Sequence, residues 1–140
     1  MHESKFKVRS TQVDLFGHLN NAAYLEIYEW ARWEWAEARG DDPMKWVEEK
    51  RIGPAILHID LTFSKEIRQS EKITVRTWYH SMERIRAQIA QEMIKADGQV
   101  ASKVLITYVM INLDTRKVTS IPDEMRAMYE ADEEYRNTLG

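Results

Sequence analysis

The chain has 140 residues, of which 44% are hydrophobic and 31% charged, a composition typical of one globular domain. The 20 basic and 23 acidic residues give a net charge of -3, so charge offers no case for nucleic acid as a ligand. Cysteine is absent, which excludes disulfides, thiolate nucleophiles and iron–sulfur clusters. No apolar run reaches the roughly 20 residues of a membrane-spanning helix, and no secretory signal is visible. We therefore expect a cytoplasmic protein with no membrane partner, folded as a single domain over residues 1–140.

The first predicted element is a short strand followed by a loop. Residues 4–9 alternate between apolar and mostly basic side chains, as in a half-buried strand. Residues 10–20 break this pattern, because they contain Gly17 and lead into two consecutive asparagines. The loop therefore ends in a helix cap at Asn20 or Asn21.

Residues 22–39 form the clearest predicted helix. Its aromatic and alanine side chains recur at steps of three and four, which places on one face Tyr24, Tyr28, Ala31, Trp35 and Ala38. Gly40 suits the end of this helix, and a shorter helix is expected at 44–50. The tryptophans point in different directions, so we expect at least one of them to meet ligand or another subunit: Trp30, Trp33 and Trp35.

The second half of the chain predicts strands with a period of two and then a terminal helix. The four strands are expected at 57–63 (with one buried face), 73–79, 85–94 and 100–114 (a central strand). Asp97 and Gly98 form a two-residue hairpin signal, and a final helix is expected at about 124–135. Hairpin connections imply an α+β fold in which an antiparallel five-stranded sheet wraps around one long central helix.

Asp14 is the first candidate for chemistry, because it lies in the loop that leads into the long helix. A helix N-terminus carries unpaired amides and a partial positive charge, which can polarise a carbonyl group. A carboxylate beside it could attack that carbonyl or direct a water molecule at it. On local sequence alone, capping a turn is the commoner role for an aspartate at such a position.

The stretch VRSTQVDLFGHLNNAAYLEIYEWAR resembles the signature of the hotdog-fold acyl-CoA thioesterases of the 4-hydroxybenzoyl-CoA thioesterase family. That signature has Asp, two residues, Gly-His-Val-Asn-Asn, a Tyr and then Glu-x-Ala-Arg. The matching positions here are Asp14, Gly17, His18, Leu19, Asn20, Asn21, Tyr24, Glu29, Ala31 and Arg32. The strand layout and the proline-led terminal helix are also similar, so the resemblance covers nearly the whole chain. It implies a hotdog fold.

The resemblance further implies an enzyme that hydrolyses an acyl-CoA thioester to a free acid and coenzyme A. Asp14 would be the catalytic carboxylate, as nucleophile or general base, and the Asn21 backbone amide would face the thioester carbonyl. His18 is a second catalytic candidate, although a histidine that only fixes the loop fits equally well. The candidates for substrate binding are Gly17, Asn20 and Tyr24, together with Arg84 and Arg86, which could meet the coenzyme A phosphates or simply be solvated.

Neither a metal nor a bound cofactor is implied, because coenzyme A enters as part of the substrate. The family works as a homodimer or homotetramer in which sheets join edge to edge and the site lies between subunits. His58 and Asp60 have a spacing that metal ligands can have, but a polar strand face explains them more simply.

Two departures from the family pattern keep alternatives open. The family often has an aromatic residue four positions before the catalytic Asp and an Asp two positions before it, whereas this chain has Ser10 and Gln12. These differences leave the acyl group unspecified. A non-catalytic acyl-thioester-binding protein remains an alternative, as does a hotdog dehydratase-like enzyme in which His18 would be essential.

Overall fold

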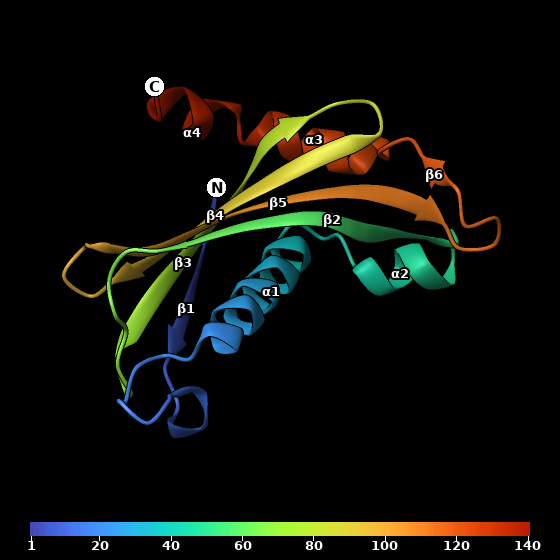
Figure 1. Ribbon diagram of the computed structural model, residues 1–140. Helices are drawn as coiled ribbons and strands as arrows, with labels where there is room; N and C mark the ends of the chain where they lie inside the picture. Colours follow the sequence, from blue (N-terminus) through green and yellow to red (C-terminus); the bar gives the residue numbers. More distant parts are fainter.

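The computed structural model describes residues 1–140 and shows an antiparallel sheet that arches over one long helix (Figure 1). The strands are β1 (His2–Lys7), β2 (Ile52–Phe63), β3 (Lys72–Met82), β4 (Arg86–Lys95), β5 (Val100–Asn112) and β6 (Val118–Thr119). The helices are α1 (Asn21–Ala38), α2 (Pro43–Glu48), α3 (Asp123–Ala131) and α4 (Glu133–Thr138), with a 3-10 turn at Ser10–Gln12. The strand order is β1-β3-β4-β5-β2, and the short β6 pairs with β5. The predicted hotdog architecture is thus confirmed, with β6 as an addition.

The sequence allowed either of two asparagines as the N-terminal cap of α1, and the structure shows which one it is. The Asn20 side chain accepts hydrogen bonds from the amides of Ala22 and Ala23, so Asn20 is the cap and Asn21 is the first helical residue. The face predicted to be buried is buried as far as Trp35, whereas Ala38 at the end of the helix is exposed.

The core consists of two clusters arranged along α1. The first surrounds the N-terminal half of the helix, where the Tyr28 hydroxyl donates to Ser102 Oγ of β5 at 2.9 Å. The second surrounds the C-terminal end and draws in side chains from the two shorter helices α2 and α3. Its aromatic and methionine members are Trp35, Trp46, Tyr79, Tyr108, Met110, Met125 and Met128.

Strand β2 differs from the prediction for residues 57–63. It begins earlier, at Ile52, and the expectation of one buried face is wrong for the isolated chain. Leu57 is 56% exposed, Ile59 38% and Phe63 49%. The reason is topological, because β2 is an edge strand whose only strand partner is β5, while α1 packs mainly on β1 and β3 at the other side of the sheet.

The terminal helix also differs from the prediction, because it is interrupted at Asp132 rather than continuous over 124–135. The Asp132 carboxylate is fully buried, and it accepts hydrogen bonds from Arg39 at 2.6 Å and from the Tyr79 amide at 2.9 Å. A buried carboxylate needs such partners, so the chain turns Asp132 inward at the point where α3 ends.

Candidate active site

Asp14 lies in a tight loop just before α1. Val13 and Leu19 form an antiparallel bridge, and the Asp14 amide donates to the His18 carbonyl oxygen at 2.8 Å. Asp14 Oδ1 accepts hydrogen bonds from the amides of Phe16 at 2.8 Å and His18 at 3.1 Å. Gly17 has a φ of +76°, in the left-handed region that glycine adopts most easily. One carboxylate oxygen is therefore held by the loop, while Oδ2 of this exposed residue has no hydrogen-bond partner in the chain.

The mouth of α1 offers one free amide next to this loop. The Asn20 side chain accepts hydrogen bonds from the amides of Ala22 and Ala23, and the Asn20 amide donates to the Gln12 carbonyl oxygen at 2.8 Å. The Asn21 amide has no partner within the chain, and the Asn21 side chain is exposed and makes no hydrogen bond. A free N–H group and a free carboxylate oxygen thus lie at the same end of α1.

His18 is tied to a residue that the sequence did not reveal. Its Nε2 lies 2.6 Å from Glu66 Oε2, in the segment that connects β2 to β3. Arg68 also binds Glu66, at 3.2 Å, and its guanidinium together with His18 keeps the pKa of Glu66 below its usual range. No local motif marks Glu66, because its partner lies far away in the sequence. The geometry fits the loop-fixing role considered for His18.

The other candidate binding residues lie in different places. Gly17 and Asn20 belong to the loop and the helix cap, whereas Tyr24 is buried below them, edge-on to the Phe63 ring at 4.8 Å. Arg84 and Arg86 lie at the β3–β4 hairpin. The Asp14 loop meets the opposite end of β3, where Gly17 accepts from the Gln69 amide. Since β3 has 11 residues, at about 3.3 Å each the strand separates the arginines from Asp14 by roughly 35 Å within one chain.

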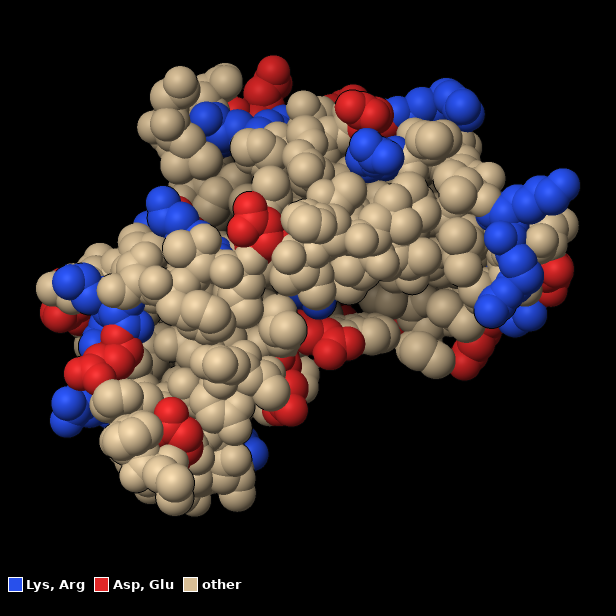
Figure 2. All heavy atoms as spheres, viewed as in Figure 1, with Lys and Arg blue, Asp and Glu red and all other residues tan.

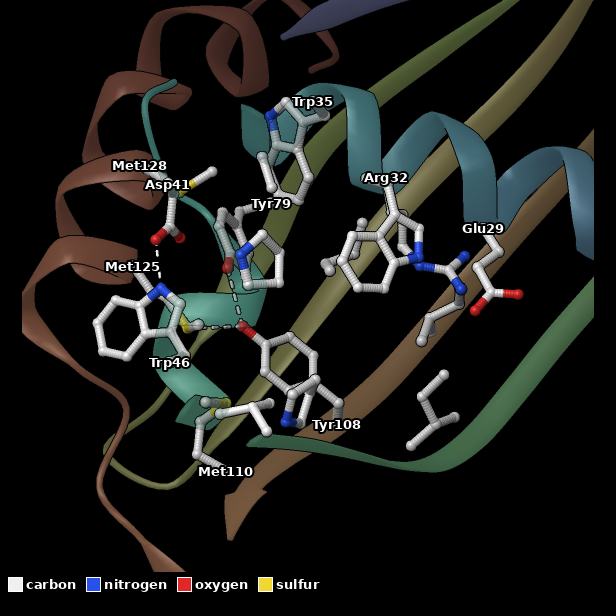
Figure 3. Close-up of a pocket in the computed structure, with 18 residues that line it drawn as sticks. Glu29, Arg32, Trp35, Asp41, Trp46, Tyr79, Tyr108, Met110, Met125 and Met128 are labelled. Atoms are coloured by element: carbon white, nitrogen blue, oxygen red, sulfur yellow. Dashed lines mark hydrogen bonds between the residues drawn. The ribbon is translucent and has the colours of Figure 1, made fainter. Parts of the chain in front are cut away.

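A cavity of about 400 Å³ lies between the C-terminal half of α1, the helices α2 and α3, and the sheet (Figure 3). This volume is in the range of small-molecule sites, and 13 of its 18 lining residues are hydrophobic. Exposed residues form its mouth along α1 and the edge strand β2, namely Glu29, Trp33, Pro54 and Ile56. Its inner end is closed by the buried residues of the second core cluster. The cavity was not predicted, because its walls come from elements distant in sequence.

A group of polar side chains lies at the inner end of this cavity, away from Glu29 and Arg32 (Figure 3). The hydroxyls of Tyr79 and Tyr108 lie 2.8 Å apart, and the Tyr108 hydroxyl also donates to the Met125 sulfur at 3.5 Å. Asp41 accepts a hydrogen bond from the Trp46 indole N–H. Burial raises the pKa of Asp41 and raises that of Tyr108 to about 12, and it also raises the pKa of Tyr79 well above its ordinary value.

The surface beside the cavity mouth is apolar. Figure 2 shows charged side chains of both signs mainly around the edge of this view, with most of the surface over β2 uncharged. The large hydrophobic side chains exposed on β2 and on α1 are Leu25, Trp30, Trp33, Ile56, Leu57, Ile59 and Phe63. Trp30 partly packs against the Phe6 ring, whereas Trp33 lies at the cavity mouth and Trp35 in its wall.

The structure contains neither a cluster of metal ligands nor a membrane-spanning helix. No three His, Asp or Glu side chains cluster closely enough to hold a metal ion, and both His58 and Asp60 are exposed on β2. None of the helices combines the length and apolar character needed to cross a membrane.

Comparison with known proteins places these features in a family. Residues 8–128 match the model of the thioesterase-like superfamily. The long-chain acyl-CoA thioesterase FadM of Escherichia coli is 29% identical over 129 residues, which cover 91% of this chain and 96% of FadM. The structure of YbaW, a probable thioesterase from Escherichia coli, superposes with a TM-score of 0.81 at 26% identity, covering 91% of this chain and 98% of YbaW. SAV2348 from Staphylococcus aureus, solved in complex with CoA, has the same fold, with a TM-score of 0.82 at 19% identity over 96% of this chain and 82% of SAV2348. The chain therefore belongs to the thioesterase-like superfamily and is a hotdog-fold thioester hydrolase, as the residues around Asp14 indicated.

Proposed function

We propose that this protein hydrolyses acyl-CoA thioesters with long aliphatic acyl groups, using Asp14 as the catalytic carboxylate and the Asn21 amide as the donor to the thioester oxygen. The observation that carries the proposal is the free carboxylate oxygen of Asp14 beside the free amide of α1. The similarity to FadM supports a long acyl group, and so does the apolar cavity. The CoA complex of SAV2348, a protein of the same fold, supports CoA as the thiol part of the substrate.

In the general-base route, Asp14 takes a proton from a water molecule whose oxygen attacks the thioester carbonyl carbon. The carbonyl oxygen gains negative charge in the tetrahedral intermediate, and the Asn21 amide stabilises it at the positive end of α1. The intermediate collapses with cleavage of the carbon–sulfur bond. The coenzyme A thiolate then takes the proton from Asp14, which gives the free acid, the thiol and a regenerated carboxylate.

In the nucleophilic route, an Asp14 oxygen attacks the carbonyl carbon and forms an anhydride, which water then opens. In a single turnover in ¹⁸O-labelled water, label that enters the Asp14 carboxylate identifies the nucleophilic route. The general-base route places the label in the released acid at the first turnover. The nucleophilic route, with water attacking the Asp14 carbonyl, places it in the protein carboxylate first.

We further infer that two subunits share the site through β2, as a homodimer. The β2 edge is unpaired and apolar, and an exposed edge of this kind favours pairing with another strand. Antiparallel pairing about the middle of β2 places the Phe63 end of one strand beside the Ile52 end of the other. Because the Asp14 loop lies near the Phe63 end and the cavity mouth near Pro54, Asp14 of one subunit approaches the cavity of its partner.

The same pairing explains how the arginines could join the site. Arg86 of β4 pairs with Val109 of β5, which in turn pairs with Ala55 of β2. Arg86 therefore lies two strands, or about 10 Å, from the edge that meets the partner subunit. A dimer brings Arg84 and Arg86 closer to the partner's Asp14 than the single chain allows, which supports a role in binding the coenzyme A phosphates.

The test is thiol release from a panel of acyl-CoA esters of increasing chain length and of aromatic type. We expect the highest kcat/KM for long aliphatic acyl groups. A preference for aromatic acyl groups would contradict the proposed substrate, and lack of hydrolysis of every ester would contradict the proposed activity.

A further inference from the structure

The closed end of the cavity contains polar groups where an aliphatic chain end needs none. We call Asp41, Trp46, Tyr79 and Tyr108 the inner polar cluster. Tyr79 is 2% and Tyr108 4% exposed, and the two rings come from strands β3 and β5, on either side of β4. Phenylalanine would fill the same space without placing hydroxyl groups in an apolar environment, where they need hydrogen-bond partners.

The hydrogen bonds within this cluster leave capacity for one more group. If the Tyr108 hydroxyl donates to the Met125 sulfur, the Tyr79 hydroxyl must donate to Tyr108. The Tyr79 oxygen then accepts no hydrogen bond, and a thioether sulfur is a weak acceptor for Tyr108. Asp41 uses one oxygen for the Trp46 indole, while its other oxygen has no partner in the chain. The free Tyr79 and Asp41 oxygens can therefore accept a hydrogen bond from a ligand. The Tyr108 hydroxyl can also donate to a ligand oxygen in place of the Met125 sulfur, which is a weaker acceptor.

The position of the cluster defines which part of a ligand it meets. The mouth of the cavity is formed by exposed residues such as Trp33 and Ile56, at the edge where the thioester would enter. The inner polar cluster lies at the opposite end, where Trp46, Tyr79 and Tyr108 are buried and Asp41 is half-buried (Figure 3). A group bound there is at the far end of the acyl chain from the thioester.

We propose that the inner polar cluster binds a hydroxyl group at the far end of an aliphatic acyl chain, so that ω-hydroxyacyl-CoA thioesters are preferred over unsubstituted chains of equal length. A hydroxyl group fits because it both donates and accepts, as the free oxygens and the Tyr108 hydroxyl require. A terminal carboxylate fits poorly, because it would face the negative charge of Asp41. The inference rests on the proposed function, since the chain must enter through the mouth beside β2.

The test compares kcat/KM for matched pairs, hexadecanoyl-CoA with ω-hydroxyhexadecanoyl-CoA and dodecanoyl-CoA with ω-hydroxydodecanoyl-CoA. One net hydrogen bond favours the hydroxylated ester by roughly two- to tenfold for the chain length that reaches the cluster. Tyr79→Phe and Tyr108→Phe should bring this ratio close to unity. Tyr129→Phe is the matched control, because it removes a hydroxyl from α3 outside the cavity and should leave the ratio as in wild type.

A wild-type ratio near unity at every chain length would overturn the inference, as would a ratio that neither cavity substitution changes. Binding of the free ω-hydroxy acids and unsubstituted acids to wild type, measured by calorimetry, gives an answer that does not depend on variants or turnover. Tighter binding of the hydroxy acid supports the inner polar cluster, whereas equal binding refutes it. Failure to hydrolyse any acyl-CoA would instead refute the proposed function, and the two failures are thereby distinguished.

Discussion

Asp14 provides the most direct test of the mechanism, because its structural and chemical roles can be separated. Asparagine at this position keeps an oxygen that can accept the two amide hydrogen bonds from Phe16 and His18, but it removes the negative charge and the basicity. Alanine removes both roles. Two exposed hydrogen bonds at about 0.5–1.5 kcal/mol each put the stability loss of Asp14→Ala at about 1–3 kcal/mol, and the exposure of the loop favours the lower end.

Asp14→Asn should therefore unfold close to wild type in urea while its turnover falls by roughly 10²–10⁴-fold, the range of a lost general base. Asp14→Ala should lose a similar amount of activity and also unfold earlier. The assays are single-turnover thiol release from the best acyl-CoA ester and denaturant unfolding followed by circular dichroism. Near wild-type turnover in Asp14→Asn would refute the catalytic assignment. Equal destabilisation of both variants would refute the account of the loop.

Four further predictions test other parts of the structure. Leu57→Asp places a charge on the exposed β2 edge and should yield monomers with little activity in sedimentation runs, whereas an active monomer would contradict the shared site. Gly17→Val should lower turnover more than Asn21→Ala, because it forces a β-branched residue to a φ of +76°, whereas the Asn21 side chain makes no hydrogen bond. A larger loss of turnover in Asn21→Ala would make the Asn21 side chain the catalytic group. Asn20→Ala should cost about 0.5–2 kcal/mol of stability, because it removes the cap of α1, and unchanged urea unfolding would contradict that role. Burial raises the pKa of Asp41 above 3.8, so the folded state holds this proton more tightly and stability is lost as pH rises through the raised pKa. Asp41→Asn keeps an oxygen that accepts from the Trp46 indole but cannot ionise. The melting temperature of this variant minus that of wild type should therefore increase as pH is raised from about pH 3 to about pH 7.

Most of the helices and strands, and the family, can be inferred from the sequence alone. Local periodicity depends only on neighbouring residues, so it located the helix around Tyr28 and the antiparallel strands, and the Asp97–Gly98 hairpin follows from turn chemistry. The loop is longer than the predicted two residues, because the Lys95 amide donates to the Gln99 carbonyl oxygen and closes a loop over residues 96–98, in which Gly98 has a left-handed φ of +88°. The motif from Asp14 to Arg32 is also local, so the sequence alone marks this loop and the mouth of the helix as the candidate site.

Tertiary structure decided the features that depend on residues far apart in the sequence. The exposure of β2 follows from its place at the sheet edge, which alternation of apolar and polar residues cannot indicate. The interruption at Asp132 follows from its bonds to Arg39 and Tyr79, and the tie between His18 and Glu66 crosses from one loop to another. The cavity is the clearest case, because its walls come from three helices and four strands that meet only when the sheet curves around α1. Side chains in such walls carry ordinary core patterns in the sequence, so only packing shows that space remains between them.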